Sequence, residues 1–443
     1  MPTPFVVPVQ GDTTLPQKVD VVVIGGGIIG CSTALELAER GLKVAVCEKG
    51  GIGREQSSQN WGWVRIGRRD TREVPLMAES LKIWAELDQR TGHSTGYTRS
   101  GIVFACATDK EYARYEEWLK CLEGLDVESK MITSAEFNNL FPDNTLSLKG
   151  AHYTPVDGRA EPQKATSAIA EGARNKGAYI LTECTVRGIE TSGGRVSGVV
   201  TEHGSIACSS VVLAGGSWSG LFLGNLGIRL PQLTVLNSVL RTAPLPEGPD
   251  TTVWTYDFAA RKRDDGGYTI ASGQANLVDV VPKSFTYFLD YIPVMLQEWR
   301  ALSLRFSTRF FEAARIPNRW ALDEESPFEY TRMLDPVPSR KILNNAFQAA
   351  CEAMPVFKKT KVIQRWGGYI DTVPDAVPVI SDVATIPGLI IATGFSGHGF
   401  GIGPAAGRLA ANLVTNEKPI VDTEPFRLSR FSDGTKIRVE CGF

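Results

Sequence analysis

A glycine-rich segment near the N-terminus constrains the fold of this 443-residue chain more than any other feature. Residues 19–24 form an apolar run interrupted only by an aspartate, which predicts a strand buried on both faces of a parallel sheet. Gly25, Gly27 and Gly30 follow with the G-x-G-x-x-G spacing, and residues 28–40 have a helical pattern. The segment therefore begins like a dinucleotide-binding βαβ unit.

The next residues complete that unit. A strand over residues 43–47 delivers Glu48, and an acid at this place can bond both hydroxyls of an adenosine ribose that lacks a 2′-phosphate. Gly25 allows the tight turn, Gly27 lets backbone approach a pyrophosphate, and Gly30 lets helix and strand pack closely. The helix N-terminus presents N–H groups and a partial positive charge to the diphosphate. We therefore predict a bound dinucleotide.

The overall composition argues against several classes of partner. Lys and Arg (47) nearly balance Asp and Glu (49), so the net charge of −2 gives no field that would recruit nucleic acid or an anionic membrane. No stretch approaches the ~18 consecutive apolar residues of a transmembrane segment, and the N-terminus lacks a signal-peptide pattern. The eight cysteines are scattered without metal-ligand spacing. We expect a reduced, cytoplasmic protein with no metal site.

The length predicts two domains, because single cores rarely grow beyond ~250–300 residues. A short strand over residues 211–214 ends in two glycines, which indicates that the chain returns there to the first sheet. We predict an α/β and α+β fold, with a discontinuous Rossmann-like domain of residues 17–90, 151–228 and 365–430 and an antiparallel-sheet domain of residues 91–150 and 229–364. Predicted helices include residues 75–90, 109–122, 157–177, 283–300, 339–352 and 404–414, and predicted strands include residues 179–191, 195–201, 233–242, 251–258 and 389–392.

Two further segments have the composition of ligand-binding loops. The loop over residues 49–70 combines glycines with four arginines and two tryptophans, which fits backbone packed against a ligand better than a solvated surface loop. Residues 389–414 read as a buried strand, a long glycine-rich loop and a helix. The N-terminus of that helix can face an electron-rich ligand atom without using any side chain.

The opening glycines, the segment LAGGSWS (213–219) and the segment ATGFSGHGFGIGPAAGRLAA (392–411) occur in one chain. Together they resemble the motifs of the FAD-dependent amine and amino-acid oxidoreductases of the D-amino-acid oxidase superfamily, particularly the glycine oxidase and monomeric sarcosine oxidase branch. The likeness spans nearly the whole chain. It implies that FAD occupies the first domain and a substrate the second.

The resemblance also implies which residues hold FAD. The helix after the last glycine-rich loop would point at N1 and C2=O of the isoalloxazine, where negative charge collects on reduction. The FAD is expected to be non-covalent, because the cysteine that links it in sarcosine oxidases falls near Gly368 and no histidine lies in the loop after Glu48. The implied contacts are Gly25, Gly27, Gly30, Glu48, Lys49, Ser57, Ser58, Asn60, Trp61, Gly62, Val186, Gly215, Trp218, Gly394, Gly397, His398, Gly399, Phe400 and Gly401.

Two carboxylate anchors of the resembled family are absent. The lysine after GHGF in sarcosine oxidases corresponds to Gly401, and the arginine of the glycine oxidase motif W-A-G-L-R-P corresponds to Ile370. Arg65 and Arg68 resemble the paired arginines of sarcosine oxidase and are expected either to bind a carboxylate or to form structural ion pairs. The expected pocket comprises Arg65, Arg68, Tyr369, Asp371 and His398. His398 is expected to bond backbone or flavin, because no acid–base partner is evident.

The implied reaction is oxidation of a C–N bond by hydride transfer to flavin N5, giving an imine that hydrolyses. The substrate is expected to be a D- or N-alkylated amino acid or a secondary amine, and the acceptor oxygen or another compound. The lysine that assists oxygen in sarcosine oxidases falls near Thr269, with Lys262 close by in sequence. This difference keeps two alternatives open: a dehydrogenase with a quinone or protein acceptor, and an FAD-binding subunit of a multi-subunit dehydrogenase.

Overall fold

The first glycine-rich segment lies in a six-stranded sheet. The structure, a computed structural model, describes residues 3–298 and 302–440. The strand order is β21-β22-β13-β1-β2-β9, and all neighbours are parallel except β21 and β22. β13 pairs with β1, which confirms that the chain returns to this sheet. The strands are β1 (Val21–Ile24), β2 (Val44–Cys47), β9 (Tyr179–Leu181), β13 (Ser210–Leu213), β21 (Val379–Asp382) and β22 (Leu389–Thr393).

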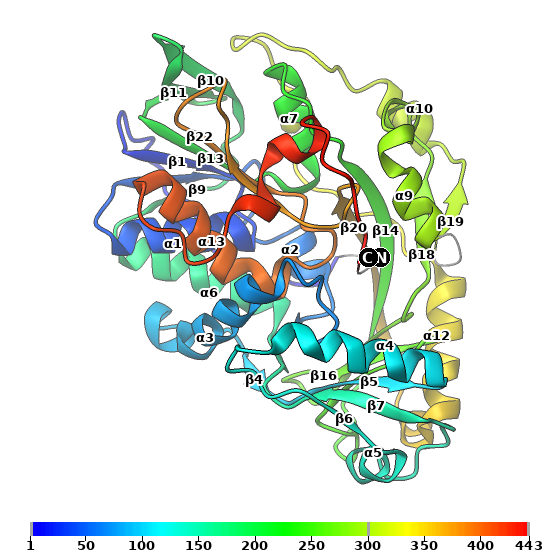
Figure 1. The fold of residues 1–443 in the computed structure, drawn as a ribbon. Coiled ribbons are helices and arrows are strands. Elements are labelled where there is room, and N and C mark those ends of the chain that lie inside the picture. Colours follow the sequence, from blue (N-terminus) through cyan, green and yellow to red (C-terminus); the bar gives the residue numbers. More distant parts are fainter. Residues whose placement is uncertain (1–2, 299–301, 441–443) are drawn as a thin grey trace.

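Both faces of this sheet are covered, as the unbroken apolar run of β1 predicts. Val21 and Val23 belong to a core with helices α1 (Ile28–Glu39), α3 (Val74–Thr91), α6 (Pro162–Asn175) and α13 (Gly399–Thr415), which lie on one side of the sheet (Figure 1). Val22 and Ile24 point the other way, into a core with β10 (Val186–Ser192), β11 (Arg195–Thr201), β12 (Gly204–Ala207) and α7 (Ser219–Asn225). Alternate side chains of one strand thus serve two cores.

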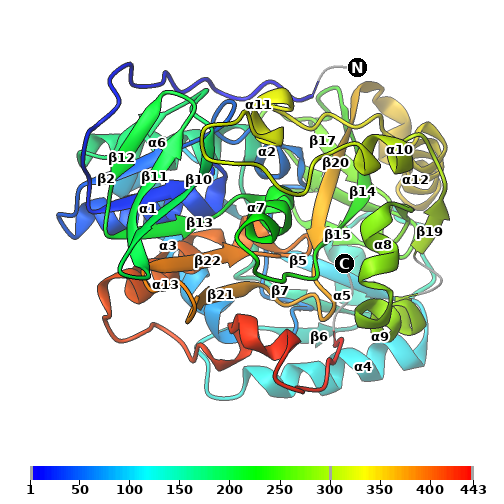
Figure 2. The same ribbon diagram turned by 90° about the horizontal axis from the view of Figure 1, so that it is seen from above.

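A second, mostly antiparallel sheet lies beside the first (Figures 1 and 2). Its order is β19-β18-β14-β17-β16-β15-β5-β7-β6, with β20 paired to β14, and only the pairs β15–β5 and β18–β19 are parallel within the described residues. Helix α12 (Arg340–Ala353) buries Leu343, Ala346 and Ala350 against it. The strands are β5 (Ile102–Cys106), β6 (Lys130–Ile132), β7 (Gly150–Thr154), β14 (Leu233–Thr242), β15 (Thr252–Trp254), β16 (Ala259–Lys262), β17 (Tyr268–Ala271), β18 (Asn276–Asp279), β19 (Leu302–Arg305) and β20 (Val362–Thr372).

Short elements connect the two sheets. Strands β3 (Trp63–Val64), β8 (Gly158–Arg159) and β4 (Thr98–Arg99) form a small third sheet in that order. The remaining α-helices are α2 (Gln56–Gln59), α4 (Asp109–Leu119), α5 (Ser134–Leu140), α8 (Pro282–Thr286), α9 (Phe288–Glu298), α10 (Arg309–Ala314) and α11 (Pro327–Tyr330). Single turns of 3-10 helix are η1 (Lys120–Leu122), η2 (Gly216–Trp218), η3 (Pro355–Lys359), η4 (Glu424–Phe426) and η5 (Leu428–Phe431).

The fold class is as predicted, but several predicted elements are wrong in extent. The strand over 179–191 is two strands, β9 and β10, because the chain turns at Glu183 with φ +51°. The helix over 157–177 begins only at Pro162, since Gly158 and Arg159 pair with β3 and β4. The helix over 404–414 begins earlier, at Gly399. The helix over 283–300 is divided into α8 and α9, and its last two residues lie outside the described residues.

The predicted domain boundaries stay a prediction. β7 and β20 pair within the second sheet, although most of β7 and β20 falls in segments predicted for the first domain. In the described part of the chain, no helix is long and apolar enough to cross a membrane. The seven cysteines there are free, and Cys441 lies outside the described residues.

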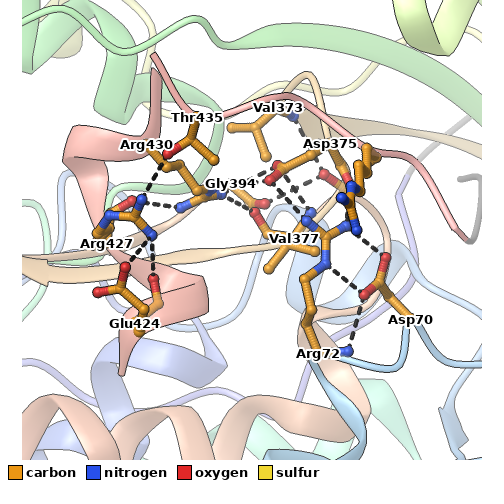
Figure 3. A network of polar contacts seen from close by, with 12 residues as sticks. Asp70, Arg72, Val373, Asp375, Val377, Gly394, Glu424, Arg427, Arg430 and Thr435 are labelled. Atoms are coloured by element: carbon orange, nitrogen blue, oxygen red, sulfur yellow. Dashed lines mark hydrogen bonds and ion pairs between the residues drawn. The ribbon is translucent and has the colours of Figure 1, made fainter. Parts of the chain in front are cut away.

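A buried polar network ties the C-terminal segment to the loop before α3 (Figure 3). Arg430 donates from Nε to Asp375 Oδ2 at 2.9 Å and from Nη2 to Oδ1 at 3.2 Å. Arg72 reaches the same Oδ2 at 3.4 Å and donates to Asp70 Oδ2 at 2.7 Å. Burial lowers the pKa of Arg430, and Asp375 acts against that shift. Buried charges need such partners, so the network fixes the loop in place.

Candidate functional site

Two adjoining cavities lie where β1, β2 and β13 end. The smaller, of about 110 Å³, is lined by Ile24, Cys47 and Leu213 at the carboxyl ends of these strands. The larger has a volume of about 210 Å³. The two share Gly27, Gln56, Ser57, Ala214 and Gly216 as walls. Ligands of open α/β sheets bind in the crevice outside the carboxyl ends of the strands, so this is the expected place for a dinucleotide.

The smaller cavity gathers residues from separate predicted motifs. Its lining includes six of the predicted cofactor residues: Gly25, Glu48, Lys49, Val186, Gly215 and Trp218. Glu48 accepts N–H groups of Gly26 and Gly50, both at 2.7 Å, on different carboxylate oxygens. A carboxylate offers about four lone-pair sites, so each oxygen can accept a further bond. Lys49 lies over the Trp218 ring at 4.7 Å.

The three glycines of the first motif meet different demands. A β-carbon on Gly30 would lie 2.0 Å from the Gly25 oxygen, and one on Gly25, where φ is +108°, would lie 2.4 Å from the Ala214 oxygen. Both glycines are therefore required by the close packing of the protein itself. A β-carbon on Gly27 would meet only Ser57 Oγ, at 3.2 Å, and Gly27 borders both cavities. Gly27 thus keeps backbone open to a ligand.

The N-termini of α1 and α13 face the larger cavity. Ile28 and Ile29 of α1, and Gly399, Phe400 and Gly401 of α13, are part of its wall. Within the described chain, neither helix has a side-chain cap from its own N-cap residue or an acid in its first turn. Their partial positive charges therefore act on the same cavity. A cradle of glycines and two helix N-termini without an acid in their first turn fits the diphosphate and the electron-accepting ring of FAD.

Arg65 and Arg68 line the larger cavity, and their predicted role toward a carboxylate stays a prediction. Arg65 donates from Nη1 to the Gly67 oxygen at 2.6 Å, and its guanidinium lies 5.7 Å from the centre of the Phe104 ring. Arg68 lies 4.1 Å from the centre of the Trp254 ring and has φ +58°, a conformation that non-glycine residues adopt mainly where the surroundings impose it. Further aromatic walls come from Trp61, Trp63 and Tyr369. Each arginine thus lies against one aromatic ring.

A buried aspartate that the sequence did not reveal holds this arginine loop. Asp157 Oδ1 accepts the N–H of Ile66 at 2.6 Å, and Oδ2 accepts that of Gly67 at 3.1 Å. Burial raises the pKa of Asp157 from 3.8 to about 7, against the effect of these N–H groups and of Arg65 and Arg69. Its partners lie far away in sequence, so no local pattern could have identified it.

Asp371 and Tyr369, on β20, also line the larger cavity. Asp371 Oδ2 accepts the N–H of Gly394 and an amide N–H of Gln232, both at 2.9 Å, so this carboxylate anchors the turn between β22 and α13. Burial raises the pKa of Asp371 and of Tyr369. Their predicted roles toward a substrate stay a prediction.

His398 has an acid partner, so the expectation that it has none is wrong. Glu73 Oε2 lies 3.0 Å from His398 Nδ1, and Arg69 Nη1 lies 3.7 Å from the same oxygen. Glu73 is the N-cap residue of α3 and is fully buried. Neither Arg69 nor Glu73 was predicted to belong to the site. Only the fold brings the loop before α3 beside the start of α13.

The other predicted cofactor residues divide into two groups. Ser57, Asn60, Trp61 and Gly397 line the larger cavity with the residues already described, and Ser57 Oγ accepts the Ile28 N–H at 2.9 Å. Four predicted residues do not line either cavity in the described chain: Gly30, Ser58, Gly62 and Gly394. Ser58 donates to the Glu55 oxygen, and a β-carbon on Gly62 would lie 2.6 Å from the Ala160 oxygen. Direct contact of these four residues with FAD stays a prediction.

Comparison with known proteins gives a matching family model and several similar proteins. A family model described as FAD dependent oxidoreductase matches residues 20–413. The chain is 35% identical to an L-amino acid deaminase from Proteus myxofaciens, solved in complex with anthranilate, with a TM-score of 0.93 and 97% of each chain covered. It is 26% identical to human mitochondrial sarcosine dehydrogenase over 94% of this chain but 42% of that protein, so it spans less than half of that relative. It is also 26% identical to glycine oxidase of Geobacillus kaustophilus, over 94% of this chain and 97% of that protein.

Proposed function

Since the chain belongs to the family of FAD dependent oxidoreductases, we propose that it oxidises the C–N bond of an amino acid. The observation that supports an amino acid is the pair Arg65 and Arg68 on the wall of the larger cavity. The first residues of α1 and α13 belong to the same wall. When bound, FAD supplies the acceptor for the substrate hydride, and the resulting imine hydrolyses in water. The two helix N-termini favour the negative charge that arrives with the electrons.

The arginines bind the substrate carboxylate in this proposal. A guanidinium offers five N–H donors in a planar fork that matches a carboxylate. The aromatic rings around them exclude water and suit an apolar side chain. L-amino acids join the D- and N-alkylated ones as candidates, because the deaminase and the sarcosine dehydrogenase named above are among the similar proteins.

The test measures steady-state turnover with an artificial electron acceptor and a panel of both enantiomers. Arg65→Met and Arg68→Met are each expected to raise KM by roughly 10- to 100-fold, the size of a lost charge-assisted hydrogen bond. Arg195→Met, at the exposed start of β11, is the matched control. If both arginine variants keep the wild-type KM, the carboxylate role is wrong. Absence of benzoate inhibition would instead favour a secondary amine without a carboxylate.

The electron acceptor is proposed to be a compound other than oxygen. Lys262, the nearest lysine in sequence to the position that assists oxygen in sarcosine oxidases, lies 2.8 Å from Asp250 and donates to the Gly248 oxygen at 3.3 Å. No lysine lines the larger cavity in the described part of the chain. Turnover that depends on a quinone or dye and consumes little oxygen would support this proposal. Oxygen consumption at the same rate would contradict it.

The FAD is proposed to be held without a covalent bond. Gly368 lines the larger cavity near the place where sarcosine oxidases carry their linking cysteine, and it has no side chain to form such a bond. Acid precipitation should therefore leave the yellow colour in the supernatant. Colour that stays with the precipitate would show a covalent link.

A further inference from the structure

A buried charged cluster at the start of α13 has no part in the reaction as described so far. The side chains of Arg69, Glu73 and His398 are 2%, 0% and 3% exposed. Glu73 Oε2 is shared between them, at 3.0 Å from His398 Nδ1 and 3.7 Å from Arg69 Nη1. Burying charge is costly even when it is paired, so a cluster of this kind beside a reactive cavity calls for a role.

The charge on Glu73 decides where His398 carries a proton. Burial raises the pKa of Glu73, but His398, Arg69 and Arg65 outweigh burial and lower it overall. Glu73 is therefore ionised, and an ionised carboxylate can only accept hydrogen bonds. An ionised carboxylate oxygen 3.0 Å from His398 Nδ1 favours a proton on that nitrogen over a lone pair. Glu73 thus favours a proton on Nδ1 of the imidazole that lines the larger cavity.

Arg69 connects the same cluster to the backbone on both sides. Its Nη2 donates to the carbonyl of His398, the N-cap residue of α13, at 3.2 Å. Its Nε donates to the carbonyl of Arg65 at 3.0 Å. The arginine loop and the start of α13 are therefore held at a fixed spacing. The negative charge of Glu73 also lies close to the positive charge of Arg69 beside the helix N-terminus.

We propose that Glu73 is a positioning residue that orients His398 and sets how strongly the bound FAD attracts electrons. This inference rests on the proposed function, because it needs FAD in the larger cavity with its ring near α13. Loss of the Glu73 charge removes a negative charge beside the start of α13 and so favours additional negative charge on the ring.

The test titrates the FAD-loaded protein with sulfite, which adds reversibly to oxidised flavin and leaves negative charge on the ring. Glu73→Gln is expected to lower the dissociation constant for sulfite by about tenfold or more, equivalent to roughly +30 mV for a two-electron couple. Glu73→Asp keeps the charge and should stay close to the wild-type value. Glu79→Gln, on the same helix but paired with Lys82 near the surface, is the matched control. A constant within about twofold of wild type for Glu73→Gln overturns the proposal.

A double-mutant cycle separates action through His398 from a direct field. If Glu73 acts through His398, the effect of Glu73→Gln shrinks in a His398→Gln background. An unchanged effect would overturn the orienting part of the proposal. Sulfite binding needs no substrate, so these results stand apart from the turnover tests of the arginines.

Nuclear magnetic resonance of isotope-labelled histidine gives a readout that does not depend on the folding of a Glu73 variant. The chain has only four histidines, and the His398 signal is the one missing in His398→Gln. The proposal is supported if wild-type His398 carries a proton on Nδ1 and Glu73→Gln loses it. If Glu73→Gln does not fold, a proton on Nδ1 of wild-type His398 is the supporting result. A wild-type His398 with no proton on Nδ1 overturns it.

Discussion

The two helices that begin at the larger cavity, α1 and α13, are built in different ways. The start of α1 depends on local glycines and on Ser57, which accepts the Ile28 N–H. The start of α13 depends on residues from α3 and the loop before it. Ser80 and Trp84 both donate to the Gly401 carbonyl, at 2.7 and 2.8 Å, and Arg69 donates to that of His398. The start of α1 therefore depends mainly on its own glycine pattern, with Ser57 as a remote acceptor, whereas the start of α13 depends mainly on tertiary contacts.

The largest expected effect is at the start of α1. Gly30→Ala places a β-carbon 2.0 Å from the Gly25 oxygen, so the turn must open. We expect FAD affinity to fall at least about tenfold, because a small misplacement of the phosphate-binding backbone removes several bonds at once. The FAD content of the purified protein measures this. Gly224→Ala in α7, where a β-carbon meets nothing within 4 Å, should keep normal FAD content. Equal content in both variants would mean that the glycine turn is not the binding element.

A pH-dependent effect is expected in the loop that supports α13. The pKa of Asp157 rises from 3.8 to about 7 on folding, so the protonated carboxyl stabilises the folded protein fully below a pH equal to the unfolded pKa of 3.8. Above that pH the stabilisation falls by about 1.4 kcal/mol per pH unit, until pH passes the folded pKa. Asp157→Asn does not titrate there, so its stability relative to wild type should increase between about pH 4 and pH 7 and then level off. Urea unfolding at several pH values measures this, and a constant difference would contradict a buried, titrating Asp157.

The smallest effect is expected where α13 has two donors for one carbonyl. Ser80→Ala removes one hydrogen bond to the Gly401 oxygen and leaves Trp84 in place, so unfolding should become easier by about 1 kcal/mol. Trp84→Phe combined with Ser80→Ala leaves neither donor. If the Gly401 carbonyl is then unsatisfied, the double variant should lose more unfolding free energy than the sum of the losses in the two single variants. Strict additivity in thermal unfolding would show that the carbonyl finds another partner.

The same contrast explains what the sequence could predict. The βαβ unit at the N-terminus and the bounds of β14 follow from local pattern and agree with the structure. The first turn of α13 was missed because Gly399, Gly401, Gly403 and Pro404 are poor helix formers, and the tertiary contacts to α1 and α3 override that propensity. Asp157 and Glu73 were missed for a related reason. Each contacts a segment that is remote in sequence, so the sequence alone does not show the partners of Asp157 or of Glu73.

The most direct test of the account is the visible absorbance of the FAD-loaded chain under anaerobic conditions, recorded before and after addition of amino acids and amines. In the proposed function, the two helix ends and the arginine pair make one site for FAD and an amino acid. At least one amino acid with a free carboxylate should therefore abolish the absorbance of the oxidised flavin. A chain that binds FAD in full and keeps that absorbance with every compound of the panel would contradict the proposed function.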